Sequence, residues 1–189
     1  MDFVSINVEN TPNPHARKFV FDRHVIADGA KVSFRNVNEC AHVPIAMNVL
    51  DVEGIKQVHF FGNCLTVSKS LVKTWDDVEP TLITLMKSMI PSHDPGFDLQ
   101  NKPSKDHYTP EMIQMDEILD ESIRPFLQAD GGDLRLVGFE SNILTVSYEG
   151  ACGSCPSSEA GTLQAIINIL REKYDPCIEV ITVPSEFTP

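Results

Sequence analysis

The spacing of hydrophobic and polar positions predicts β-strands in the first part of the chain. Residues 3–9 alternate between apolar and polar side chains, and residues 18–22 resume a strand pattern after the two prolines of Thr11–Pro14. Residues 58–68 hold two β-prone runs joined by Gly62-Asn63, a pairing typical of a hairpin turn. We therefore expect two strands and a hairpin here.

Helical spacing predicts two helices in the same part of the chain. Residues 44–54 have the pattern of a short helix that Gly54 ends. Residues 76–90 predict a longer helix, with Asp76 as its candidate N-cap and Pro80 near its first turn. Strands and helices together indicate an α/β unit, and no residue pattern in it demands a chemical site.

A second set of elements begins at Thr109, a candidate helix cap followed by Pro110 at the first helical position. The apolar side chains that follow recur at spacings of three and four, which predicts one helix with a single buried face. These side chains are Met112, Met115, Leu119, Ile123 and Phe126. Pro125 is expected to kink or end this helix.

The rest of the chain alternates strands with one helix. Residues 134–139 and 143–148 predict a second hairpin around Ser141-Asn142. A loop with two cysteines follows, then an amphipathic helix over residues 163–174 and a last strand over residues 177–183. The predicted order is helix, strand, strand, cysteine loop, helix, strand.

A proline-rich polar segment separates these two sets of elements. Residues 91–108 contain three prolines and no hydrophobic period, which is typical of a linker. We predict two small domains of mixed α/β class, with boundaries at 1–91, 92–108 for the linker and 109–189.

Composition limits the classes of function. The 189 residues are 42% hydrophobic, enough for packed cores, and no apolar run reaches 18 residues, so we expect no membrane span. The net charge of −12 argues against a nucleic-acid partner. The charge is uneven: residues 1–92 carry 10 acidic and 9 basic side chains, and residues 93–189 carry 17 and 6.

Cysteine usage indicates the compartment. Five cysteines are too few, and odd in number, for a disulfide scaffold, and the first residues lack the features of a secretory or transit signal. We therefore expect a reducing cytoplasm, with the mitochondrial matrix as the alternative if a transit peptide has been removed.

Cys152 and Cys155 form the one cysteine pair with a spacing typical of chemistry. They stand between a predicted strand and a predicted helix that has Pro156 at its start. Free amides and the helix dipole stabilise anions there, which favours thiolates. Gly150 and Gly153 allow a tight turn and a close approach of the backbone to a ligand.

Several uses of this pair remain open. Two packed cysteines are the plainest, although a loop rich in glycine and serine is a poor place to bury them. A structural zinc site needs four ligands, and the chain has no second C-x-x-C and no H-x-x-x-H. A thioredoxin-like redox pair would need more sheet after the helix than the final residues supply, but disulfide chemistry on another fold survives as the alternative.

Symmetry offers a further use. Two chains around a two-fold axis would bring two cysteine pairs together and supply four thiolates, the number that a 2Fe–2S or 4Fe–4S cluster requires.

The cysteine loop, Gly150–Ser158 (GACGSCPSS), resembles that of the Nfu family, whose members are related to the C-terminal domain of NifU. Ile123–Asp133 (IRPFLQADGGD) is similar to the helix and turn that precede the sheet of that domain. Thr11–Pro14 (TPNP), with Lys18-Phe19, resembles an element of the Nfu N-terminal domain. The resemblance covers nearly the whole chain apart from the linker.

This resemblance implies a scaffold or carrier rather than an enzyme. It would hold a 4Fe–4S cluster, with 2Fe–2S as the other nuclearity, between the protomers of a homodimer, on Cys152 and Cys155 of each. It would receive the cluster from an upstream scaffold and pass it to apo-proteins. The thiol–disulfide oxidoreductase remains the alternative function.

Other candidate side chains are interpreted as surface, turn or packing residues. His15 and His42 are predicted to be single surface histidines, because no second ligand stands at a metal-binding spacing. Asp130 and Asp133, which flank two glycines, are interpreted as turn residues. Cys177 is predicted to pack at the start of the last strand, and Cys40 and Cys64 receive no role.

Overall fold

The chain folds as two compact units. The structure, a computed structural model, describes residues 4–97, 105–154 and 156–184. The units are Met1–Lys102 and Pro103–Pro189, and each has its own hydrophobic core. The predicted class, two small domains of mixed α/β content, is confirmed. The predicted linker includes residues 98–104, which lie outside the described residues.

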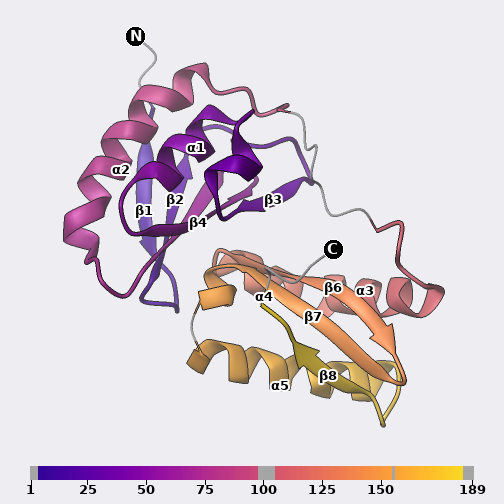
Figure 1. The fold of residues 1–189 in the computed structure, drawn as a ribbon. Helices are drawn as coiled ribbons and strands as arrows, with labels where there is room; N and C mark the ends of the chain where they lie inside the picture. Colours follow the sequence, from indigo (N-terminus) through magenta and orange to yellow (C-terminus); the bar gives the residue numbers. More distant parts are fainter. Residues whose placement is uncertain (1–3, 98–104, 155, 185–189) are drawn as a thin grey trace. The chain divides into compact units, whose positions relative to one another are not determined.

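Unit 1 is built on an antiparallel sheet. Over its described residues the sheet has five strands in the order β1-β2-β5-β4-β3 (Figure 1). The strands are β1 (Ile6–Asn10), β2 (Ala16–Phe21), β3 (Lys31–Phe34), β4 (Ile55–Phe61) and β5 (Cys64–Lys69). The hairpin predicted around Gly62-Asn63 is confirmed: it joins β4 to β5, and Gly62 adopts a φ of 53°.

Two α-helices and two short 3-10 segments complete unit 1 in the described residues. They are η1 (Val37–Cys40), α1 (Pro44–Asp51), α2 (Trp75–Met89) and η2 (Ile90–Ser92). The predicted cap of α2 was wrong. Thr74 caps the helix, and its hydroxyl and the Asp77 carboxylate each accept a hydrogen bond from the other residue's backbone N–H. Pro80 therefore lies beyond the first turn, inside the helix.

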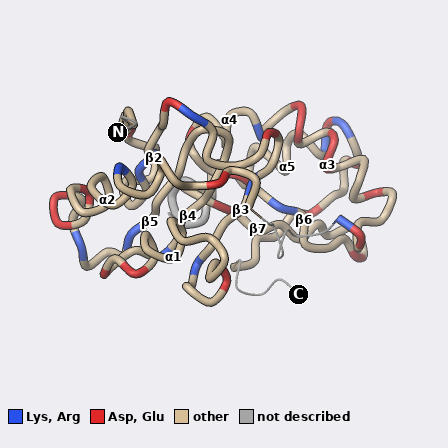
Figure 2. The backbone as a smooth tube through the Cα atoms, turned by 90° about the horizontal axis from the view of Figure 1, so that it is seen from above, with Lys and Arg blue, Asp and Glu red and all other residues tan. Residues whose placement is uncertain are grey.

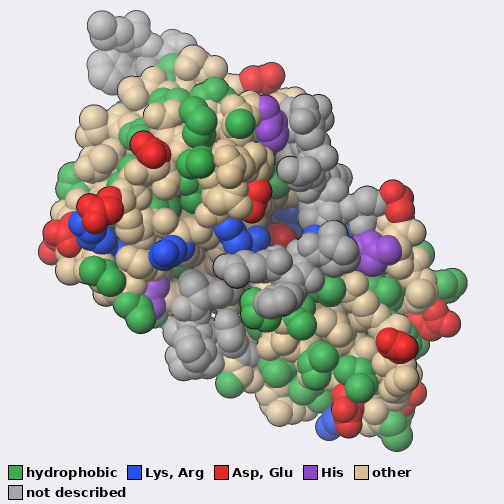
Figure 3. Space-filling model, viewed as in Figure 1, with side chains coloured by type: hydrophobic (Ala, Val, Ile, Leu, Met, Phe, Trp, Pro, Cys, Tyr) green, Lys and Arg blue, Asp and Glu red, His purple; other side chains and the backbone are tan. Residues whose placement is uncertain are grey.

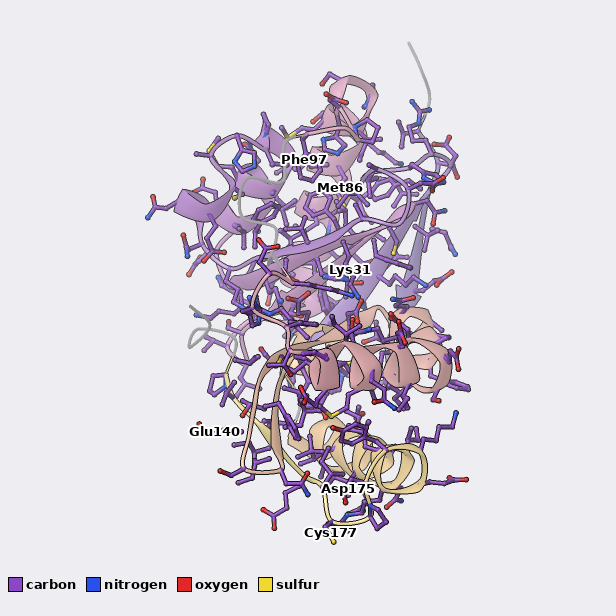
Figure 4. All side chains as sticks on the ribbon, turned by 90° about the vertical axis from the view of Figure 1, so that its right-hand side faces the viewer. Lys31, Met86, Phe97, Glu140, Asp175 and Cys177 are labelled. Carbon is purple, nitrogen blue, oxygen red and sulfur yellow. The ribbon has the colours of Figure 1, made fainter. Side chains whose placement is uncertain are left out.

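Both helices of unit 1 cover the same face of the sheet. Register places Phe19, Leu65, Phe60 and Val32 side by side across four strands, and these side chains form one apolar surface. The helices pack on that surface through buried positions such as Met86 of α2, which is labelled in Figure 4.

Unit 2 combines a small mixed sheet with helices on it. In the part of unit 2 that the structure describes, the strands run in the order β6-β7-β8, with β6 and β7 antiparallel and β7 and β8 parallel. The elements are α3 (Pro110–Ser122), α4 (Arg124–Ala129), β6 (Gly132–Glu140), β7 (Ile143–Gly150), η3 (Ala151–Ser154), α5 (Pro156–Lys173) and β8 (Glu179–Thr182). The order predicted around the cysteine loop is confirmed.

The first helix predicted for unit 2 is interrupted. Helix α3 begins after Thr109, whose hydroxyl accepts a hydrogen bond from the Met112 N–H as expected. It ends before Ile123, and α4 starts a new helix with a proline in its first two positions. The break changes the helical phase. Leu127 packs into the core instead of Phe126, which is 67% exposed against prediction.

The surface of the described residues is mixed in character. Acidic side chains recur along α3, which appears with red segments in Figure 2. Hydrophobic side chains are interspersed with polar ones over the face drawn in Figure 3. Among the described helices, none combines the length and apolar character that crossing a bilayer requires.

Candidate metal centre

Cys152 lies on η3, in the short connection between the end of β7 and the start of α5. It is 8% exposed and packs against the core of unit 2. Cys155 lies outside the described residues, so the geometry of the pair remains a prediction. The burial of Cys152 is also what the packed-cysteine interpretation expects, so burial alone does not separate the two uses.

Glycines build the floor beneath Cys152. Gly132 at the start of β6 lies opposite Gly150 at the end of β7, and the Ala151 N–H donates a 3.1 Å hydrogen bond to the Gly131 carbonyl. A Cβ on Gly150 would stand 2.4 Å from the Gly131 oxygen, and Gly150 has a φ of 61°. Only glycine fits this approach without strain.

Helix α5 begins at Pro156, within the Gly150–Ser158 segment that holds the cysteine pair. The prediction that Pro156 opens the helix is confirmed. The first turn of a helix has backbone N–H groups without intrahelical acceptors and the positive end of the helix dipole. A thiolate close to this helix start would gain that stabilisation.

A buried ion-pair network supports the strand that holds Gly132. Asp133 is 0% exposed, and its carboxylate lies 3.3 Å from Nε of Arg124 and accepts a 3.2 Å hydrogen bond from Gln128. Arg124 also pairs with Asp116 and Asp120. The interpretation of Asp133 as a turn residue was wrong. Its sequence neighbours suggest a turn, and its partner Arg124 is supplied by α4.

The charges of this network are fixed by mutual pairing. Burial alone would raise the pKa of Asp116, but the hydrogen bond from Lys105 and the charge of Arg124 outweigh it, so this pKa lies below its ordinary value. For Arg124, burial acts to lower the pKa, and the charge of Asp116 raises it overall. Asp116 and Arg124 therefore both stay ionised at neutral pH.

The other described cysteines lie outside the cysteine loop. Burial raises the pKa of the Cys40 thiol to about 11, and that of the Cys64 thiol to about 11. Both stay protonated at neutral pH, and thiols in this state are poor metal ligands. Cys177 is exposed in the turn before β8, beside Asp175 (Figure 4), so the prediction that it packs in the last strand was wrong.

One histidine, His24, lies beside a carboxylate, with its Nδ1 3.2 Å from Oδ1 of Asp28. His42 is half-buried, and its ring lies edge-on to Phe34 at a centroid distance of 6.3 Å. Within residues 4–97, 105–154 and 156–184, no group of three or more His, Cys, Asp or Glu side chains is arranged to hold a metal ion.

Comparison with known proteins assigns both units. The family model "Scaffold protein Nfu/NifU N terminal" matches residues 6–93, and the model "NifU-like domain" matches residues 115–181. The class of protein is therefore a two-domain chain with an Nfu-type first domain and a NifU-like second domain.

Relatives align along nearly the whole chain, across both matched regions. The "NFU1 iron-sulfur cluster scaffold homolog, mitochondrial" of Drosophila erecta is 30% identical over 183 residues, covering 93% of this chain and 63% of the relative. In Arabidopsis thaliana, "NifU-like protein 4, mitochondrial" is 32% identical over 190 residues (96% and 66%), and "NifU-like protein 5, mitochondrial" is 31% identical over 190 residues (96% and 68%). This chain belongs to the Nfu family.

The chain spans about two thirds of the length of these relatives, between 63% and 68%. The three relatives are named as mitochondrial proteins, and none of their names supports the cytoplasmic expectation.

Proposed function

We propose that this protein is an iron–sulfur cluster carrier that binds its cargo between two protomers. Cys152 and Cys155 of each chain would supply four thiolates to a 4Fe–4S cluster, or to a 2Fe–2S cluster as the other nuclearity. The observation that carries the proposal is the glycine-built loop that places Cys152 directly before α5. The name of the Drosophila erecta relative, an iron-sulfur cluster scaffold homolog, supports the same cargo.

The donor set fits this cargo chemically. Cysteine thiolates are the ligands that iron–sulfur clusters use, and the start of a helix offsets part of their negative charge. One chain contributes only two such sulfurs from this loop, so a second copy is required to complete the coordination.

A cluster held in this way suits transfer better than storage. No single chain would enclose it, so separation of the protomers would expose it. Each iron–sulfur bond to Cys152 or Cys155 would then break as a client thiolate forms its own bond to the same iron, without net oxidation or reduction. The carrier would turn over no substrate, and its partners would be an upstream cluster scaffold and apo iron–sulfur proteins.

The mitochondrial matrix is the compartment that we propose, in place of the cytoplasm expected at first. The basis is the names of the three relatives described above, each of which includes the word mitochondrial. Immunofluorescence of the native protein against a matrix marker tests this assignment, and a purely cytosolic signal would contradict it.

Anaerobic reconstitution with iron and sulfide tests the cargo. We expect a brown protein with about four iron and four sulfide per two chains, or about two and two for the smaller cluster. Mössbauer spectroscopy distinguishes the two clusters, and native mass spectrometry gives the number of chains in the loaded species. A loaded species with the mass of one chain would contradict the proposal.

Cysteine variants test the ligands. Cys152→Ser and Cys155→Ser should each abolish cluster retention, because either change leaves two of four sulfur positions empty in a dimer. Cys177→Ser is the matched control, since Cys177 is exposed and outside the loop, and it should retain the cluster fully. Iron retention in the double variant Cys152→Ser/Cys155→Ser would sink the assignment.

The same preparation distinguishes a cluster carrier from the alternative function. A thiol–disulfide oxidoreductase with this pair would be colourless after reconstitution and would reduce disulfide substrates catalytically.

A further inference from the structure

The space for the Cys152 sulfur exists because residue 132 has no side chain. A Cβ built on Gly132 would stand 2.3 Å from Sγ of Cys152, 2.9 Å from its backbone nitrogen and 3.1 Å from its Cβ. Rotation of the cysteine side chain would relieve the first contact but not the second, because the nitrogen belongs to the backbone. Any side chain at Gly132 therefore requires the cysteine loop to move.

A second glycine in the same strand shows that this requirement is local. A Cβ on Gly138, also in β6, would meet no atom within 4 Å. Gly138 sits at an irregularity of the β6–β7 register, between Leu136 and Gly138, and does not approach the cysteine loop. Loss of a glycine from β6 is thus tolerable at one position and not at the other.

The residue after Gly132 anchors the strand in place. The Asp133 carboxylate accepts a 2.7 Å hydrogen bond from the Leu134 N–H and one from Gln128, and it faces Nε of Arg124. Because Gln128 and Arg124 both belong to α4, the start of β6 is tied to that helix. The backbone of Gly131 adds two hydrogen bonds: its N–H donates to the Gln128 carbonyl, and its carbonyl accepts from the Ala151 N–H.

We propose that Gly132 is a positioning residue for the Cys152 thiolate, and that Asp133, paired with Arg124, holds Gly132 against the cysteine loop. This inference rests on the proposed cluster-binding function. Residues behind metal ligands set the ligand's orientation, and their loss typically weakens metal binding about 10- to 100-fold. Here the supporting contact is made by the backbone of a glycine and fixed by a buried carboxylate.

The test compares Gly132→Ala with Gly138→Ala, the same chemical change in the same strand. Both variants are reconstituted with iron and sulfide without oxygen and then challenged with an iron chelator. Gly132→Ala should lose its cluster about 10- to 100-fold faster than wild type and show a shifted visible circular dichroism spectrum. Gly138→Ala should match wild type in both measurements.

A readout without metal tests positioning directly. In a background of Cys155→Ser and Cys177→Ser, the alkylation rate of Cys152 reports the surroundings of its thiol in the metal-free chain. Gly132→Ala should change that rate severalfold, and Gly138→Ala should leave it as in the parent. A Gly132→Ala protein with wild-type chelator kinetics, spectrum and alkylation rate would overturn the inference.

If Gly132→Ala does not fold, a second pair of variants tests the same inference. Asp133→Asn keeps the side-chain shape and removes the charge that faces Arg124, and exposed Asp130→Asn is its control. The first should release its cluster faster than wild type, and the second should not. If both release it at the wild-type rate, the inference is wrong.

The outcomes distinguish failure of this inference from failure of the proposed function. If wild type takes up no cluster, the proposed function fails. If wild type and all four variants hold the cluster equally, only the positioning role fails.

Discussion

Asp116 is a buried residue whose charge contributes to the stability of unit 2. It is 3% exposed and pairs with Arg124 and Lys105. Asp116→Asn should lower the free energy of unfolding of unit 2 at pH 7 by about 2–3 kcal/mol, below the ~3–5 kcal/mol of a lone buried pair, because Asp120 and Asp133 still face Arg124. Urea denaturation followed by tyrosine fluorescence measures this, since Tyr108, Tyr148 and Tyr174 all belong to unit 2.

The same carboxylate gives unit 2 a pH dependence of defined sign. The pKa of Asp116 is lowered in the folded state, so its contribution is complete above the ordinary value of about 3.9 and is lost as the pH falls through the lowered value. Wild type should therefore lose more stability than Asp116→Asn does as the pH falls from about 5 to about 3. Equal losses in the two proteins would contradict this account.

Single residues also mark where sequence patterns stop being informative. The spacing of three and four carries the apolar face as far as Ile123, and the structure confirms it there. Ile123 lies between α3 and α4 and interrupts the helical period, so that Leu127 is buried and Phe126 is exposed. The predictions for Asp133 and Cys177 were wrong for a related reason. The environment of Asp133 depends on Arg124 of α4, and that of Cys177 depends on the residue at which β8 begins. Neither is encoded in nearby residues.

The elements with complete local signals were predicted, and those without were missed. Ser141-Asn142 and Gly62-Asn63 predict their hairpins because Asn and Gly tolerate positive φ. The structure shows a φ of 65° for Asn142 and 53° for Gly62, and Ser141 also adopts a positive φ, of 51°. Strand β3 was not predicted. It has four residues and is defined by pairing with β4, which lies more than twenty residues later in the chain.

Helix α2 provides a direct test of how much a cap contributes. Thr74→Ala removes the hydroxyl that accepts from the Asp77 N–H and should destabilise unit 1 by about 1 kcal/mol. Urea denaturation followed by the fluorescence of Trp75, the single tryptophan, measures unit 1 alone.

Thr84→Ala is the matched control for that helix. The Thr84 hydroxyl donates to the Pro80 carbonyl on the exposed side, so its loss should change stability by no more than about 0.5 kcal/mol. If the two variants lose equal stability, the capping box has no special role.

At the scale of the molecule, the two units have separate cores, and the candidate site belongs to one of them. Phe97 packs on the core of unit 1 and Tyr108 on that of unit 2, on either side of residues 98–104. The candidate ligand Cys152 and its glycine floor, with the ion pairs behind them, are all contributed by unit 2. The sequence pointed to this unit through its cysteine spacing, but the floor could not be predicted, because Gly132 and Cys152 meet only once the β6–β7 ladder has formed.

This arrangement predicts that unit 2 is sufficient for cluster binding. A fragment of residues 103–189 should fold, because its core of buried apolar side chains is contained within it, and should take up iron and sulfide in the same ratio per two chains as the full protein. Tyrosine fluorescence during urea denaturation shows whether the fragment is folded, and metal analysis with native mass spectrometry shows loading and dimer formation. A folded fragment that binds no cluster, beside a full chain that does, would assign part of the site to unit 1 and contradict the division of labour argued from the two cores.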